Sequence, residues 1–187
     1  MLSKWTPWDF QRNYSGLISQ EGAYAIKIFD SYVEKIIINY FKKKIHADTK
    51  LTYMLGSEIT KGWIEEKFEM LNLFSEVSST IILNAQDIKS EVIDYFLTLK
   101  PEISDLYFIF LFNKREDRSF RKLKHLNFQL LEILEPKFWE MGKLLTFFAD
   151  EMKVQLNLEV HQFILENVPN DSGSFCSLLR RLYFLSE

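Results

Sequence analysis

The sequence is poor in cysteine, glycine, proline and histidine, and each shortage excludes a class of protein. The one cysteine, Cys176, excludes an internal disulfide and a multi-cysteine zinc site, and it is typical of a reducing compartment such as the cytoplasm. Only 6 Gly and 4 Pro occur among 187 residues, too few for a fibrous or low-complexity chain. His46, His125 and His161 lack the spacing of a metal site, so we expect neither a metal nor a cofactor.

Long apolar runs and an excess of positive charge are missing as well. The longest apolar run, Leu106 to Phe112, is far shorter than the roughly 18 residues of a membrane-spanning helix. Residues 1–11 lack the pattern of a secretory signal. A net charge of −3 argues against a protein whose main task is the non-specific capture of phosphate backbones. We therefore expect no membrane partner, and we do not expect DNA capture to be the main task of the protein, although local basic patches remain possible.

The sequence does contain an alternation of strand-like and helix-like segments. Leu106–Phe112 is apolar on both faces, which is typical of a central parallel strand. A helix is expected across Tyr24 to Tyr40, where tyrosine and isoleucine recur at intervals of four. This alternation predicts the α/β fold class, with a doubly wound, mostly parallel five-stranded sheet. The five expected strands are Tyr14–Ile18, Leu51–Leu55, Ser79–Asn84, Leu106–Phe112 and Gln129–Leu134.

The chain changes character near Pro136. Everything after it has the apolar periodicity of helices, with Phe175, Leu178, Leu179 and Leu182 forming one stripe on the last of them. The sequence therefore predicts an α/β domain over residues 1–136 and a small all-helical domain over residues 137–187.

The loop that would hold phosphate lacks the residues for it. In nucleotide-binding sheets this loop follows the first strand and reads G-x-x-x-x-G-K-[ST], because backbone N–H groups and a lysine surround the phosphates. After the expected strand at Tyr14–Ile18 the sequence has one glycine, Gly22, no lysine, and a glutamate, Glu21, that would repel phosphate. We expect no ATP hydrolysis at this position, and no other catalytic group of residues stands out.

Three segments resemble one known family, the delta subunit of the bacterial DNA polymerase III clamp loader. The first runs from Lys114 to Trp139 (KREDRSFRKLKHLNFQLLEILEPKFW), where a charged stretch, a strand, a proline and aromatics follow one another. The second, Leu144 to Leu182, resembles the helical lid of the family, and the third covers residues 53–83. The resemblance implies an AAA+-like first domain without a nucleotide site. It also implies that the collar domain of the family is absent from this chain, and Trp5 and Trp8 lie in an extension to which the family gives no role.

The resemblance also implies a role and partners. Delta subunits bind and help open the sliding clamp (the beta subunit) during DNA replication, and they meet the other loader subunits and, through the loader, DNA. In this sequence Leu73 and Phe74, flanked by Met70 and Leu71, match the apolar pair that the family inserts into the clamp. Without the resemblance, a Leu-Phe pair between a helix and a strand is ordinary core.

A second candidate surface is basic. Six cations gather between positions 114 and 124 and could contact DNA or an acidic partner, although Glu116 and Asp117 among them also fit a solvated surface. They are Lys114, Arg115, Arg118, Arg121, Lys122 and Lys124. Two alternatives to a clamp-binding protein stay open: a DNA-binding adaptor that uses this stretch, and an α/β enzyme with an unrecognised phosphate site.

Overall fold

The structure of the chain, a computed structural model, describes residues 2–18, 21–45, 50–68, 78–99, 106–113, 118–125 and 128–186. Its strands are β1 (Leu2–Trp5), β2 (Gly22–Lys27), β3 (Lys50–Leu55), β4 (Ser78–Leu83), β5 (Tyr107–Phe112) and β6 (Gln129–Ile133). Its α-helices are α1 (Pro7–Leu17), α2 (Ser31–Lys44), α3 (Lys61–Phe68), α4 (Ser90–Leu99), α5 (Arg118–Lys122), α6 (Met141–Glu151), α7 (Leu158–Asn167) and α8 (Ser172–Ser186). Short 3-10 helices are η1 (Gly56–Glu58), η2 (Ala85–Asp87), η3 (Leu123–His125) and η4 (Phe138–Glu140). No helix in these ranges is long and apolar enough to cross a membrane.

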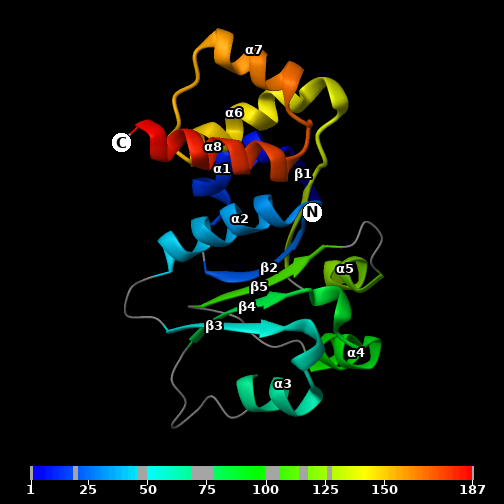
Figure 1. Cartoon of the computed structure of the whole chain (residues 1–187). Helices are drawn as coiled ribbons and strands as arrows, with labels where there is room; N and C mark the ends of the chain where they lie inside the picture. The colour runs from blue at the N-terminus through cyan, green and yellow to red at the C-terminus, as the bar shows by residue number, and fades with distance from the viewer. Residues whose placement is uncertain are drawn as a thin grey trace.

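All six strands form one parallel sheet in the order β1-β6-β2-β5-β4-β3. Figure 1 shows β2, β5, β4 and β3 side by side in this order. Strand β5 lies between β2 and β4 with every residue buried, which confirms the prediction of a central strand. The predicted count of five strands is wrong, because β1 adds an edge strand beside β6. With four residues, β1 is too short to show a pattern of its own.

The predicted strand at Tyr14–Ile18 is also wrong, because α1 extends through Leu17. The signals that begin α1 lie further upstream, in a capping box. Thr6 Oγ1 accepts a hydrogen bond from the Asp9 backbone N–H at 3.2 Å, and the Asp9 carboxylate accepts one from the Thr6 N–H at 3.1 Å. Pro7 occupies the first turn, where its missing N–H costs nothing. These contacts fix the start of the helix at Pro7, and the helix then continues through Tyr14 to Leu17.

The helix predicted across Tyr24 to Tyr40 begins too early. Gly22–Lys27 is strand β2, and α2 begins only at Ser31, after its N-cap Asp30. A spacing of four residues fits one face of a helix, but it also fits one face of a strand, whose side chains repeat every two residues. The tyrosines therefore could not separate the two structures. The first strand of the α/β core is β2, which also moves the expected position of a phosphate loop.

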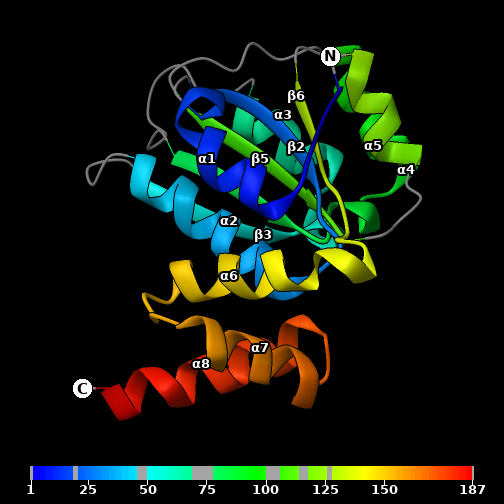
Figure 2. The same cartoon turned by 90° about the horizontal axis from the view of Figure 1, so that it is seen from above.

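Two apolar cores lie on opposite faces of the sheet. On one face, Tyr24 and Ile26 of β2 join a cluster with α1 and α2, and on the other Ala23 and Ala25 join a cluster with α3 and α4. Figure 2 shows α1 and α2 in front of the strands and α3 behind them. Since neighbouring residues of a strand point to opposite faces, this division confirms a doubly wound sheet covered on both sides.

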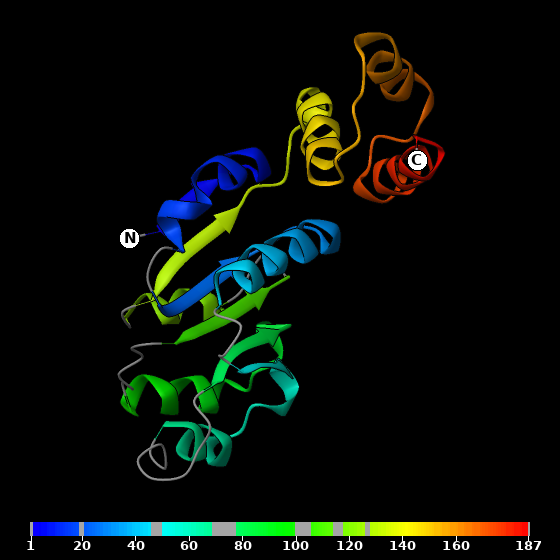
Figure 3. The same cartoon turned by 90° about the vertical axis from the view of Figure 1, so that its left-hand side faces the viewer.

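The three C-terminal helices extend the first of these cores. Leu144 and Phe148 of α6, Ile164 of α7 and Phe175 of α8 belong to the same apolar cluster as the α1 and α2 face of the sheet. Figure 3 shows α6, α7 and α8 grouped together beyond α1 and α2. The predicted helical character of residues 137–187 is therefore confirmed over the described residues. Their separation into a domain at 136/137 stays a prediction.

Candidate functional site

The connection between β2 and α2 is the position at which sheets of this topology hold phosphate, beyond the carboxyl ends of the strands. It consists of Ile28, Phe29 and Asp30, with neither a glycine nor a lysine. Asp30 Oδ1 accepts hydrogen bonds from the backbone N–H groups of Tyr32 at 2.7 Å and Val33 at 3.1 Å. A carboxylate of the chain itself thus occupies the amides that a phosphate would use.

Amide side chains fill the neighbouring strand ends. Asn84, which follows β4 in the left-handed conformation (φ 52°), accepts a hydrogen bond through Oδ1 from Asn113 Nδ2 at 3.1 Å. The Asn113 backbone N–H donates to Gln86 Oε1 at 3.0 Å. Gly56, at the end of β3, packs so tightly here that a Cβ would lie 2.3 Å from the Asn84 carbonyl oxygen. The carboxyl edge of β3, β4 and β5 is therefore closed by its own residues.

A hollow of about 420 Å³ remains at the carboxyl ends of β2 and β6, and its charges are paired. Lys27 Nζ donates to Glu132 Oε1 at 2.7 Å, and Lys4 Nζ lies 3.5 Å from the other carboxylate oxygen. The hydrogen bond from Lys27 is the main reason that the pKa of Glu132 lies below its usual value. Across the described ranges, no three His, Cys, Asp or Glu side chains gather as a metal site would require.

The helix that precedes the predicted clamp-binding pair packs on the second face of the sheet. Helix α3 is fixed to the sheet by aromatic packing: Trp63 stacks on Phe108 with ring centroids 6.0 Å apart, and Phe68 meets Phe108 edge-on at 5.1 Å. Glu65 Oε1 also accepts a hydrogen bond from the Tyr95 hydroxyl of α4 at 2.8 Å. These contacts make α3 a rigid support whose last residue, Phe68, is anchored in the core.

Lys67 joins the two ends of the segment that carries the predicted pair. Its Nζ donates to the carbonyl oxygen and to the hydroxyl oxygen of Ser78, the first residue of β4, both at 2.7 Å. Burial lowers the pKa of Lys67. The residues predicted to contact the clamp, Met70, Leu71, Leu73 and Phe74, lie outside the described residues, so their role stays a prediction.

The predicted basic surface is only partly available. Lys114 and Arg115 lie outside the described residues, while Arg118, Arg121 and Lys124 are exposed on α5 and η3. Lys122 instead reaches α4, where its Nζ donates to Asp94 Oδ1 at 2.5 Å and to Ser90 Oγ at 2.9 Å. Phe120 and Leu123 are buried and hold this segment against the second core. Lys122 therefore connects α5 to α4. Of the six predicted cations, Arg118, Arg121 and Lys124 are the described ones that are exposed.

Cys176 is buried, as the apolar stripe around it predicts. Only 1% of its surface is exposed, and burial raises the pKa of its thiol to about 12. A thiol of this kind is neutral at pH 7 and unreactive. Among the histidines, His46 lies outside the described residues, and His161 Nε2 lies 3.1 Å from the Gly142 carbonyl oxygen in the contact between α7 and α6.

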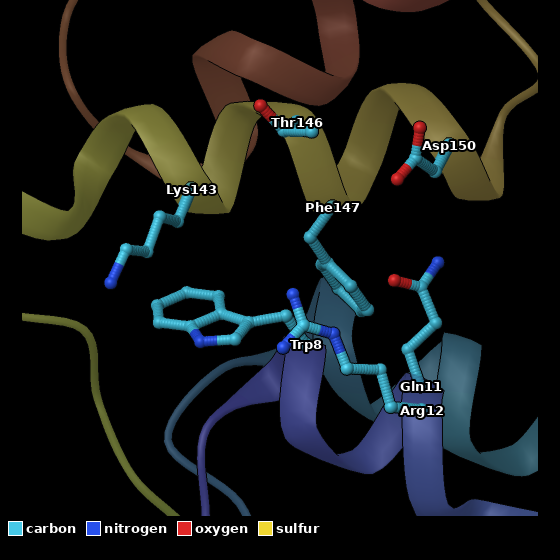
Figure 4. A pocket seen from close by; sticks show the side chains of 7 residues that line it. All are labelled: Trp8, Gln11, Arg12, Lys143, Thr146, Phe147 and Asp150. Atoms are coloured by element: carbon cyan, nitrogen blue, oxygen red, sulfur yellow. The ribbon is translucent and has the colours of Figure 1, made fainter.

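The structure also forms a groove that the sequence did not predict, between α1 and α6 (Figure 4). Its volume is about 300 Å³. The lining residues are Trp8, Gln11 and Arg12 from α1, and Lys143, Thr146, Phe147 and Asp150 from α6. On each helix the lining residues recur at intervals of three or four, which marks one face. That spacing was readable from the sequence, but the pairing of two helices so far apart in the chain was not.

Comparison with known proteins shows the fold. No protein-family model and no curated protein matches the sequence. Among solved structures, the Bacillus subtilis DNA clamp loader delta protein matches with a TM-score of 0.62 at 12% identity, covering 97% of this chain and 58% of its own. Domain III of the Thermotoga maritima replication initiation protein DnaA matches with a TM-score of 0.50 at 14% identity, covering 95% and 79%. The Thermotoga maritima RuvB Holliday junction branch migration motor gives 0.50 at 10%, covering 90% and 57%.

These likenesses confirm the predicted fold class, an AAA+-like α/β sheet with helices. The match to the clamp loader delta protein extends over nearly the whole chain, so the C-terminal helices are included in the shared fold. This chain spans 58% of the length of that protein. The resemblance that the sequence suggested thus has a structural counterpart.

Proposed function

We propose that the chain is a delta-like clamp-loader subunit, which binds a sliding clamp and helps to open it during DNA replication without an ATPase activity of its own. The chain would bind the other loader subunits and would act in the cytoplasm. It would contact DNA only indirectly, as a part of the loader. Two observations together support the proposal. The chain shares its fold with a clamp loader delta protein, and in this chain Asp30 occupies the position where phosphate would bind.

The proposed lack of ATPase activity rests on the connection between β2 and α2, where phosphate would bind. A nucleotide in an AAA+-like sheet needs free backbone N–H groups at the start of the helix after the first core strand, and a lysine beside them. Here the Tyr32 and Val33 amides donate to Asp30, and the connection has only three residues. Binding a triphosphate would require this carboxylate to leave and would bring two negative groups together. The site therefore supports a structural rather than a catalytic role.

The clamp contact is assigned to Leu73 and Phe74, with Met70 and Leu71 beside them. A large apolar side chain that enters a pocket on a partner contributes roughly 1.5 to 3 kcal/mol. Such a contact needs a firm base, and Trp63, Phe68 and Lys67 supply one at the end of α3. In this assignment residues 1–136 form the clamp-binding domain and residues 137–187 the helical lid.

The test is the affinity of the purified chain for the sliding clamp of the same source, measured by surface plasmon resonance. The double variant Leu73→Ala/Phe74→Ala is expected to lose roughly 100-fold or more in affinity, because two anchors are removed. The matched control is Tyr53→Ala/Leu55→Ala, which removes two apolar side chains that are 41% and 43% exposed on the edge strand β3. Equal affinities of the two folded variants would reject the assignment of Leu73 and Phe74, and a wild-type chain that does not bind the clamp would reject the function.

The rival reading as a DNA-binding adaptor rests on Arg118, Arg121 and Lys124, which are exposed. Binding through them would weaken steeply as the salt concentration rises, since each neutralised phosphate releases counterions. Lys122 is already paired with Asp94, which weakens this reading. Binding of duplex DNA that disappears in Arg118→Glu/Arg121→Glu, together with no affinity for the clamp, would favour the adaptor.

A further inference from the structure

The groove between α1 and α6 combines aromatic surface with positive charge. Trp8 is half-buried, and Lys143 Nζ lies 5.6 Å from the centroid of its ring. Arg12 is exposed and makes no ion pair within the described parts of the chain. Figure 4 shows the Arg12 and Lys143 side chains extending toward Trp8, with Gln11 and Asp150 at the other end. One end of the groove is thus a cationic pocket with an indole wall.

A second, more exposed aromatic side chain lies just before α6. The 3-10 helix η4 ends at Glu140, which is the N-cap of α6 and has non-helical dihedral angles (φ −103°, ψ 3°). Trp139 therefore lies one residue before this cap, and Lys143, Thr146 and Asp150 follow it on one face of α6. Trp139 is 75% exposed, and Lys137 Nζ lies 5.1 Å from its ring centroid. The groove and Trp139 form a continuous strip in which each tryptophan has a lysine beside it.

We propose that this strip, made of Trp8, Arg12, Trp139 and Lys143, binds single-stranded nucleic acid. Proteins that hold single strands combine a positive groove along the backbone with aromatic side chains on which bases stack. Here Trp139 is the stacking surface, while Arg12 and Lys143 contact phosphates and Trp8 forms the wall between them. A volume of about 300 Å³ leaves room for part of a strand.

The acidic groups of the strip limit its affinity but leave its cationic end free. Asp150 lies at the end away from Trp8 (Figure 4). Glu140 is partly engaged, because its Oε2 accepts a hydrogen bond from the Lys137 backbone N–H at 3.0 Å and its Oε1 lies 4.0 Å from Lys143 Nζ. A third acid, Glu151, accepts a hydrogen bond from the lining residue Gln11 at 2.9 Å. Set against Arg12, Lys137 and Lys143, the three acids leave no excess charge over the whole strip, so its positive charge is confined to the end at Trp8. We therefore expect modest binding that falls as the salt concentration rises.

This inference goes beyond the proposed clamp contact and does not depend on it. The strip belongs to α1, η4 and α6, whereas the clamp contact is assigned to Leu73 and Phe74, in the part of the sequence between α3 and β4. The strip also differs from the basic stretch of α5 and η3, which has no exposed aromatic side chain among its described residues. Nucleic-acid binding can be measured without a clamp, so failure of one proposal is separable from failure of the other.

The experiment is fluorescence anisotropy with a labelled oligothymidylate of about 16 nucleotides, the upper end of the stretch that one small single-strand-binding fold covers. The full chain is titrated at low salt, with duplex DNA of the same length and thymidine monophosphate as comparisons. Arg12→Glu/Lys143→Glu is expected to weaken binding about tenfold or more. Trp139→Ala is expected to weaken it about fivefold or more.

Arg180→Glu/Arg181→Glu is the matched control, because it makes the same change of charge at two exposed positions of α8. Retained binding in this control supports the strip. Circular dichroism checks that each variant is folded, and Trp139→Ala, at a largely exposed position, keeps the test valid if a charge reversal unfolds the chain.

Four results would overturn the proposal. The first is a wild-type chain that does not bind the single strand at low salt. The second is equal loss of affinity in the strip variant and the α8 control, which would indicate general electrostatics. The third is binding that is lost only in Arg118→Glu/Arg121→Glu, which would move the site to α5. Binding of the duplex as strong as that of the single strand would also contradict a stacking site.

Discussion

The two edges of the sheet satisfy their polar groups in different ways. At the carboxyl edge, Asp30 caps α2, Asn84 and Asn113 bind each other, and Lys27 pairs with Glu132. At the amino edge, the described contacts instead secure the base of a segment, through Lys67 and Ser78. In this AAA+-like sheet, the polar groups at the edge where nucleotides bind are therefore satisfied by the chain itself.

The largest effect is expected at the amino edge, from Phe68→Ala. Phe68 packs between Phe108 and Phe96 at centroid distances of 5.1 and 5.6 Å, and its loss leaves a gap under α3. The free energy of unfolding should fall by about 2 to 3 kcal/mol, less than for a fully buried phenylalanine. Urea denaturation checks this value. Leu55→Ala, at a side chain that is 43% exposed, is the control, and equal losses in the two variants would show that α3 is not anchored as described.

The next effect concerns the cap of α2 at the carboxyl edge. Asp30→Ala removes the acceptor of two backbone hydrogen bonds and should lower the free energy of unfolding by about 1 to 2 kcal/mol. Asp30→Asn keeps an oxygen in the same place and should cost only a few tenths of a kcal/mol. If the two variants were equally destabilised, charge rather than capping would hold this position. Thermal and urea unfolding of both proteins make the comparison.

The ion pair of the hollow should give a smaller effect that depends on pH. Because the folded-state pKa of Glu132 is below the usual value of a glutamate, the carboxylate stabilises the fold above that usual value, and this stability is lost as the pH falls through the lowered pKa. Glu132→Gln should cost about 1 to 2 kcal/mol at pH 7 and progressively less below about pH 4. Lys4→Gln, at a side chain that is 59% exposed, should cost less than about 0.5 kcal/mol. A difference between wild type and Glu132→Gln that stays constant down to pH 3 would contradict the pairing.

The last prediction is that a nucleotide has no effect on stability. ATP with magnesium should leave the melting temperature unchanged, because Asp30 occupies the amides of the phosphate position. A ligand present at about 100 times its dissociation constant would add about 2.7 kcal/mol to the free energy of unfolding, which a thermal-shift assay detects easily. A clear rise of the melting temperature with ATP would favour the alternative hypothesis of an enzyme with an unrecognised phosphate site.

Much of the sheet could be predicted from sequence, because its central strands are buried on both faces. Leu106–Phe112 shows this directly, and β3, β4 and β6 were bounded to within a residue or two. The N-terminal region could not be resolved from periodicity alone, since intervals of four residues fit both β2 and a helix. The sequence did contain better signals there, Thr6-Pro7 with Asp9 for the start of α1 and Asp30 for the start of α2.

The sites were less predictable, because they depend on residues that are distant in the chain. The sequence placed the missing phosphate loop at residues 19–24, whereas the equivalent connection is Ile28–Asp30. The closure of the carboxyl edge needs Asn84 and Asn113 to meet, and neither has a local motif. Leu73 and Phe74 were chosen by resemblance alone and remain a prediction.

The most direct measurement is the dissociation constant of the wild-type chain for the sliding clamp, determined with and without ATP and magnesium. The account predicts that the chain binds the clamp and that the two constants are equal, because the contact is assigned to Leu73 and Phe74, whereas the amides of the nucleotide position are already occupied by Asp30. No binding, or an affinity that changes when ATP is added, would contradict it.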